Sequence, residues 1–299
     1  MLPTDVAVEL LHAAIQRAAD VRSLGILFLK GPAASLQGLR PKKISSDVDV
    51  LVDSDHRDAL AVLLADWGFT PRPRPSTAKY YAAHATSFIH PHWPVDVDIH
   101  TSFPGLLASD RVVFQELSAA ATTVSLANYQ CRVPSRAGSA LVLAAHDTRT
   151  AARYPERAEQ IARLAATVRS SFDSVEKVEL ATLAPALGAA RSLSGFLSLA
   201  GIDVDASIDR ASDSDLSRWV RTEKSGHSMS SVAVNSFGTM LRKGDLRAAA
   251  RVVWPSNADI ELALGAPSRP LDRLRYRGER LWRAASRRSV SSNGAGGVE

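Results

Sequence analysis

Apolar and polar positions along the chain follow two different periods, and the change between them divides the sequence. Apolar residues at helical spacing predict a helix over residues 4–21, and the run "GILFL" at 25–29 predicts a short buried strand. "DVDVLV" at 47–52 alternates and is β-branched, so it predicts a second strand, followed by a helix over 56–69. Further strands are expected at 79–89, 95–100, 122–126 and 131–133.

From Ser135 onward the pattern becomes alanine- and leucine-rich with helical spacing. Strands followed by helices, rather than alternating with them, favour an α+β fold over a doubly wound sheet. We therefore expect a small mixed sheet flanked by helices in residues 1–134, an all-helical domain in 135–268, and a basic amphipathic segment with a disordered tail in 269–299. The serine- and aspartate-rich stretch from 203 to 231 is expected to be a loop-rich region between helices, with a helical segment around residues 216–220.

Composition narrows the class of protein. The chain has 299 residues, 45% of them hydrophobic, which is enough for a sizeable core. A single cysteine, Cys131, excludes an internal disulfide and favours a reducing, cytoplasmic location. No apolar run approaches the length of a membrane span, and the first residues do not resemble a signal peptide. Eight arginines against three acidic residues from Arg269 onward account for the whole net charge of +5.

Neither the alternation of apolar and polar residues nor the composition explains why aspartates occur in pairs on the predicted strands. Asp47 and Asp49 lie two apart on one predicted strand, and Asp96 and Asp98 do the same on another, so each pair points to one side. If these strands are neighbours, the repulsion between the carboxylates raises their pKa values unless a cation neutralises them. Mg²⁺ prefers such oxygen ligands. The alternative is that these aspartates cap turns or lie at a solvated strand end.

A glycine turn, Lys30-Gly31, follows the first predicted strand. Glycine allows backbone N–H groups to approach a phosphate closely, and Lys30 adds positive charge. The alternative is a simple tight turn before a short helix beginning at Pro32. The basic loop residues that follow, Arg40, Lys42 and Lys43, are equally compatible with a solvated loop and with binding of a triphosphate or an anionic acceptor.

These residues together resemble a known family. "LKG", then "SDVDVLV", a helix ending in "WGF", and "VDVDIH" are similar to the nucleotidyltransferase superfamily with the DNA polymerase β type of fold. The similarity is greatest to a group of uncharacterised bacterial nucleotidyltransferases with an "LKG…R…DIDLLV…DLHW" pattern. The resemblance covers roughly residues 10 to 105, about a third of the chain.

The resemblance implies a site and a reaction. Asp47, Asp49 and Asp98 would be the catalytic, metal-binding carboxylates, with Asp96 flanking them and His100 beside Asp98. Lys30, Gly31 and Lys43 would bind the phosphates of a nucleoside triphosphate, ATP included. Two Mg²⁺ ions would then assist transfer of an NMP group to an acceptor hydroxyl on a small molecule, a tRNA or a protein. Lys43 stands where the family usually has arginine, so bidentate phosphate binding is lost there.

Other interpretations remain open at this stage. The same fold can be a non-catalytic nucleotide-binding or protein-interaction module. The histidines between His84 and His100 match no zinc motif, and His146 on its apolar helix is more typical of a core histidine than of a cleft residue. The stripe of Leu271, Leu274, Gly278, Leu281, Trp282 and Ala285 predicts packing on the helical domain, with nucleic-acid binding or contact with an anionic membrane surface through the arginines as alternatives.

Overall fold

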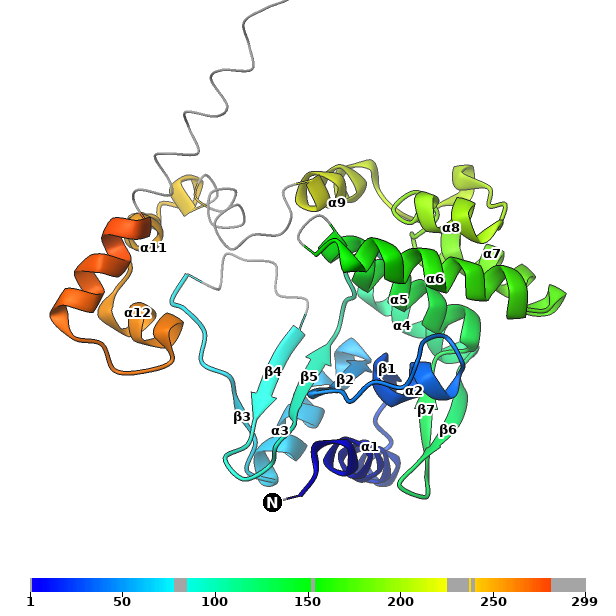
Figure 1. Cartoon of the computed structure of the whole chain (residues 1–299), viewed down its shortest axis with the longest axis horizontal. Helices are drawn as coiled ribbons and strands as arrows, with labels where there is room; N and C mark the ends of the chain where they lie inside the picture. Colours follow the sequence, from blue (N-terminus) through cyan, green and yellow to red (C-terminus); the bar gives the residue numbers. More distant parts are fainter. Residues whose placement is uncertain (1, 78–84, 152–153, 225–236, 238–239, 281–299) are drawn as a thin grey trace, which may run out of the picture. The chain divides into compact units, whose positions relative to one another are not determined.

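A five-stranded mixed sheet forms the first part of the structure, a computed structural model that describes residues 2–77, 85–151, 154–224, 237 and 240–280 (Figure 1). The strands are β1 (Ile26–Leu29), β2 (Asp47–Val52), β5 (Asp96–His100), β4 (Ala85–Ile89) and β3 (Thr70–Pro71), in that order across the sheet. β2 and β5 are parallel, and the other neighbouring pairs are antiparallel. Parallel pairing places equivalent residues of β2 and β5 side by side.

Contacts divide the chain into two units, residues 1–72 with 84–228 and residues 73–83 with 229–299. In the first unit, α1 (Thr4–Val21) packs on one face of the sheet, and α2 (Gly31–Leu36) follows β1. A 3₁₀ turn, η1 (Ser54–His56), leads into α3 (Arg57–Asp66). After β5 come α4 (Asp110–Ala119) and the antiparallel hairpin of β6 (Thr122–Leu126) and β7 (Tyr129–Val133).

The helical part of the same unit follows the hairpin. It consists of α5 (Arg136–Ala151), α6 (Glu156–Ser171), α7 (Ser174–Ala186), α8 (Ser194–Ala200), the 3₁₀ turn η3 (Ala206–Ile208) and α9 (Asp213–Lys224). α5 is almost wholly buried, and it packs against α6 and α7 (Figure 1). The predicted α+β class, a small mixed sheet flanked by helices and followed by further helices, is therefore confirmed.

The two faces of the sheet bury two different apolar clusters. Val48, Val50 and Val97 pack with α1 and α3 in one cluster. Leu29 and Leu51, on the opposite face, pack with α4 and α5 in a second cluster that extends through α6, α7 and α8. The predicted boundary after residue 134 thus falls inside a continuous apolar cluster, and the division into two domains there stays a prediction.

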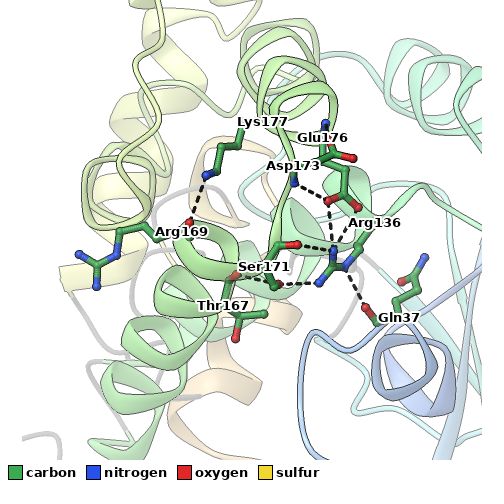
Figure 2. A network of polar contacts seen from close by, with 8 residues as sticks. All are labelled: Gln37, Arg136, Thr167, Arg169, Ser171, Asp173, Glu176 and Lys177. Atoms are coloured by element: carbon green, nitrogen blue, oxygen red, sulfur yellow. Dashed lines mark hydrogen bonds and ion pairs between the residues drawn. The ribbon is translucent and has the colours of Figure 1, made fainter.

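One arginine connects the segment after α2 to the helical part. The guanidinium of Arg136, at the start of α5, donates to the carbonyl of Gln37, to the carbonyl and hydroxyl of Ser171, and to the carboxylate of Glu176 (Figure 2). Glu176 also closes the capping box of α7 with Asp173. A single side chain with donors in a fixed fork therefore holds three segments together.

The ends of several elements follow from local caps and turns. Pro3 is the N-cap of α1, and among the described residues no side chain caps this helix. Asp53 caps the η1 turn rather than α3, because the chain makes this turn before the helix begins. The described part of 203–231 contains η3 and α9, which confirms the helix expected around 216–220; Asp213 and Asp215 favour the positive end of this helix. Part of the strand predicted at 79–89 lies outside the described residues.

The described residues of the second unit include the short helices α11 (Leu246–Val253) and α12 (Asn257–Leu264), and residues 240–242 and 270–280 are also helical. Arg277 donates to the carbonyl of Pro255, and Arg280 to that of Val252. Leu271 and Leu274, by contrast, are 78% and 57% exposed. In the described part of this segment, arginines make the packing contacts instead of the predicted apolar stripe, whose remaining members from residue 281 onward lie outside the described residues.

Candidate metal centre

The parallel register of β2 and β5 brings the two aspartate pairs together. Asp47 lies beside Asp96, and Asp49 lies beside Asp98. Because residues directly opposite one another in a sheet point to the same face, all four carboxylates and His100 project from one side. The predicted convergence of the two D-x-D strands is therefore present in the fold.

Three of these side chains form a tighter group. One ligand atom each from Asp49, Asp98 and His100 lie within 4.8 Å of one another. The two outer aspartates have other partners: Asp47 accepts a hydrogen bond from the Ser45 hydroxyl at 2.9 Å, and Asp96 is paired with Arg72. We call Asp49, Asp98 and His100 the acidic group below. The acidic group thus includes His100, which the sequence resemblance placed only beside Asp98 and not among the metal-binding residues.

Asp49 lies at the centre of the acidic group, and its side chain is only 4% exposed. The ammonium of Lys30 is 2.8 Å from its Oδ1, and Nε2 of His100 is 2.9 Å from the same oxygen. Burial alone raises the pKa of Asp49, but the hydrogen bond from His100 and the charge of Lys30 outweigh it and hold the pKa far below its usual range. Asp49 is therefore ionised at neutral pH, with two positive or hydrogen-donating partners.

Asp47 is in the opposite situation. Its pKa is raised, first by burial and then by the neighbouring charge of Asp49, with a further contribution from Asp98; the hydrogen bond from Ser45 and the charge of Lys30 only partly oppose this. Repulsion from Asp49 and Asp98 therefore adds to the effect of burial on this pKa. A divalent cation would relieve that repulsion.

The glycine turn has an unusual backbone. Lys30 is the N-cap of α2 with φ 57° and ψ −132°, a conformation that residues other than glycine rarely adopt. Gly31 follows with φ +45°, and its carbonyl accepts a hydrogen bond from Arg40 Nη2 at 3.1 Å. Arg40, which the sequence placed only in a basic loop, thus lies at the turn, whereas Lys43 is exposed.

Further charged side chains come from the helical part. Asp147 on α5 forms an ion pair with Arg157 on α6 at 2.8 Å, and the charges of Arg40 and Lys30 also act on it. Burial lowers the pKa of Arg149, which the charge of Asp49 partly opposes. The charges of Arg40, in the loop after α2, and of Arg149, on α5, therefore act on Asp49. Spacing along the chain gave no signal for this, because α5 reaches the site only through its packing on the sheet.

His146, on α5, keeps the neutral form. Burial lowers its pKa to about 2, and the charges of Lys30, Arg149 and Arg157 act in the same direction. A surface depression of about 400 Å³ lies elsewhere, against α8, and none of its lining residues belongs to the acidic group.

Comparison with known proteins gives distant likenesses among solved structures alone. No family model and no curated protein matches the chain. Among solved structures, an antigenic nucleotidyltransferase-like protein from Paracoccidioides brasiliensis is similar over 69% of this chain and 97% of its own, with a TM-score of 0.39 and 14% identity. At that level no activity or substrate follows for this chain, so its function is proposed from its own residues.

Proposed function

We propose that the protein is a nucleotidyltransferase that depends on a divalent cation. It would move an NMP group from a nucleoside triphosphate to an acceptor hydroxyl and release pyrophosphate. One observation carries the proposal: the register of β2 and β5 gathers Asp49, Asp98 and His100 within 4.8 Å, next to the Lys30-Gly31 turn. The acceptor is a small molecule, a tRNA or a protein.

The donor set fits a divalent cation with a preference for oxygen. Asp49 and Asp98 supply carboxylate oxygens, and Asp47 adds a third carboxylate on the same face. Because a carboxylate can only accept, Nε2 of His100 donates to Asp49, which fixes that side chain in place. Bound Mg²⁺, one or two ions, would neutralise phosphate charge and acidify the acceptor hydroxyl.

The remaining steps belong to the chain's own residues. The β- and γ-phosphates would lie against the Lys30-Gly31 turn, with Arg40 and the more exposed Lys43 as further positive charges. Asp98, which is less buried than Asp49, would take the proton from the acceptor hydroxyl. Most of the rate enhancement would come from positioning and charge, as in other phosphoryl transfers.

A non-catalytic module is the second candidate, and one contact favours it. Lys30 and His100 already satisfy Asp49, so the buried carboxylate is stable without a metal ion. A nucleotide-binding or protein-interaction protein could retain the acidic group for structural reasons alone. The two candidates differ in what they predict for nucleotide transfer.

The deciding experiment offers each α-³²P-labelled nucleoside triphosphate with Mg²⁺ to the protein in a cell extract. Protein, RNA and small-molecule fractions are then separated, and the labelled fraction identifies the acceptor class. Asp98→Asn should lower transfer by about 10³-fold, because it removes both a ligand and the proton acceptor.

Asp96→Asn is the matched control, since Asp96 lies on the same strand and face but is paired with Arg72. It should stay within a few-fold of the wild type. Equal activity of the two variants would overturn the assignment of Asp98. No label in any fraction, together with no nucleotide binding by calorimetry, would favour the non-catalytic module.

Two further expectations belong to this proposal. Among the described residues, no helix is both long enough and apolar enough to cross a membrane. A cytoplasmic location remains a prediction from the single cysteine. Nucleic-acid binding through the C-terminal arginines also remains a prediction, and Arg273, Arg277 and Arg280 contact their own unit.

A further inference from the structure

The ammonium of Lys30 contacts the same carboxylate, Asp49, that a metal ion at the acidic group would use. It is 2.8 Å from Oδ1 of Asp49, the carboxylate at the centre of the acidic group, and the Lys30 side chain is only 11% exposed. A cation and an ammonium cannot both occupy close positions beside one buried carboxylate without strong repulsion. The contact therefore competes with metal binding at Asp49.

The backbone at Lys30 shows that the contact is built into the fold. Lys30 follows β1, whose last residue, Leu29, pairs with Asp49 in the sheet. Its φ of 57° is unfavourable for a residue with a Cβ, and such strain persists only where the surroundings impose it. The ring of Phe103 lies under the ammonium, 5.7 Å from centroid to Nζ, and also contacts His100. The side chain is thus held from several sides.

We propose that Lys30 is the counter-ion of Asp49 in the metal-free protein and that a divalent cation displaces it. The displaced ammonium then turns to the polyphosphate of the nucleotide, which carries the negative charge that Asp49 no longer offers. Metal binding and nucleotide binding would reinforce each other, because each removes a competitor of the other. This inference rests on the proposed metal-dependent function. It adds that the metal ion replaces the Lys30 ammonium at Asp49 before the ammonium binds the nucleotide.

The first test measures binding of Mn²⁺ alone at pH 8 by calorimetry. Lys30→Met keeps the apolar stem and removes the competing charge, so it should bind Mn²⁺ about tenfold more tightly than the wild type. Lys30→Arg keeps a charge and adds a second donor for the carboxylate, so it should bind Mn²⁺ no better than the wild type.

Lys177→Met is the matched control. It removes the same charge from α7, where the ammonium donates to the carbonyl of Arg169 (Figure 2). Its affinity for Mn²⁺ should equal that of the wild type. An equal gain in Lys177→Met would show a general charge effect and overturn the proposal.

A second test uses the wild-type protein and does not depend on the folding of any variant. Reductive methylation of lysines, followed by peptide mass spectrometry, reports the accessibility of each amine. Mn²⁺ should increase methylation of Lys30 several-fold and leave methylation of Lys177 unchanged. When a non-hydrolysable nucleoside triphosphate is added together with Mn²⁺, the increase at Lys30 should disappear.

The outcomes separate this inference from the proposed function. Nucleotide transfer by the wild type, with equal Mn²⁺ affinity in Lys30→Met and no change in Lys30 methylation, would overturn the displacement while leaving the transferase intact. Absence of Mn²⁺ binding in both the wild type and Lys30→Met would overturn the displacement too. In that case the labelling experiment decides separately whether transfer occurs.

Discussion

The two faces of strands β2 and β5 use the same backbone for opposite purposes. On one face Val48, Val50 and Val97 are fully buried against α1 and α3. On the other face Asp49 is nearly as deeply buried, at 4% exposure, yet it is ionised. The difference is that each valine needs only apolar neighbours, whereas Asp49 needs Lys30 and His100.

Burial depth alone therefore does not distinguish a position in the apolar core from a position in a functional site. A carboxylate in a low-dielectric setting is tolerated when paired charges and hydrogen bonds replace its water. The stability of the charged face consequently depends on the partners of its carboxylates. The stability of the apolar face depends on the shape and polarity of its side chains. Substitutions that place a charge on the apolar face, or remove a partner from the charged face, test this distinction.

The largest effect is expected from a carboxylate placed on the apolar face. Val50→Asp would bury a charge without a partner and should lower the free energy of unfolding by about 5 kcal/mol or more. Urea denaturation followed by circular dichroism measures the change. Val62→Asp is the control, because Val62 on α3 is 60% exposed, and it should cost about 0.5 kcal/mol. A similar loss in both variants would contradict the contrast between the faces.

A smaller effect is expected when the charged face loses one partner. Lys30→Met should destabilise the metal-free protein by about 4 kcal/mol, because Asp49 is left with His100 alone. Lys30→Met combined with Asp49→Asn should recover about 2 kcal/mol of this loss, since no buried charge then lacks its counter-ion. Urea denaturation of the four proteins in the double-mutant cycle gives the coupling. Strictly additive losses would mean that the two side chains do not stabilise each other.

The smallest effect concerns a buried histidine that borders the apolar face. His12 on α1 is fully buried, its ring lies 4.6 Å from that of Phe28, and burial lowers its pKa to about 4 despite a hydrogen bond to the carbonyl of Val8 and the charge of Asp49. The unfolded chain therefore binds this proton more readily, and stability that is complete above pH 6.5 should fall by about 3 kcal/mol towards pH 4.

His12→Leu removes the titrating group and should flatten stability between pH 6.5 and pH 4. Urea midpoints across this range measure the slope. His146, whose pKa is lowered further, remains in the variant, so a residual slope is expected. An unchanged slope in His12→Leu would show that His12 does not titrate as its burial indicates.

Much of the fold could be predicted because it depends on local pattern. The β-branched alternation of 47–52 identified β2, and the change of period after Ser135 identified the helical part. The parallel pairing of β2 with β5 could only be stated as a condition, because a non-local pairing leaves no mark in either segment. The ends of elements were less accurate where a turn intervened, as η1 does before α3.

The site was predictable to the extent that it follows from alternation along a strand. Asp49 and Asp98 were named as candidates from their spacing and the family resemblance, and they are among the residues that the structure gathers. The partners of Asp49 were not predictable. The ion pair with Lys30 depends on an unusual backbone angle, and the contact with His100 depends on the register of two strands. Arg40 and Arg149 reach the site through loop geometry and helix packing, for which sequence spacing carries no information.

The fork of Arg136 has a consequence for how this chain can vary. Its guanidinium holds the carbonyl of Gln37, just beyond the glycine turn, and the corner between α6 and α7 at Ser171 and Glu176. An insertion that moved this corner would also have to move the end of α2. Otherwise the guanidinium donors of Arg136 would lose their acceptors. The length of the corner between α6 and α7 and the backbone at the end of α2 should therefore vary together, although these segments lie more than a hundred positions apart.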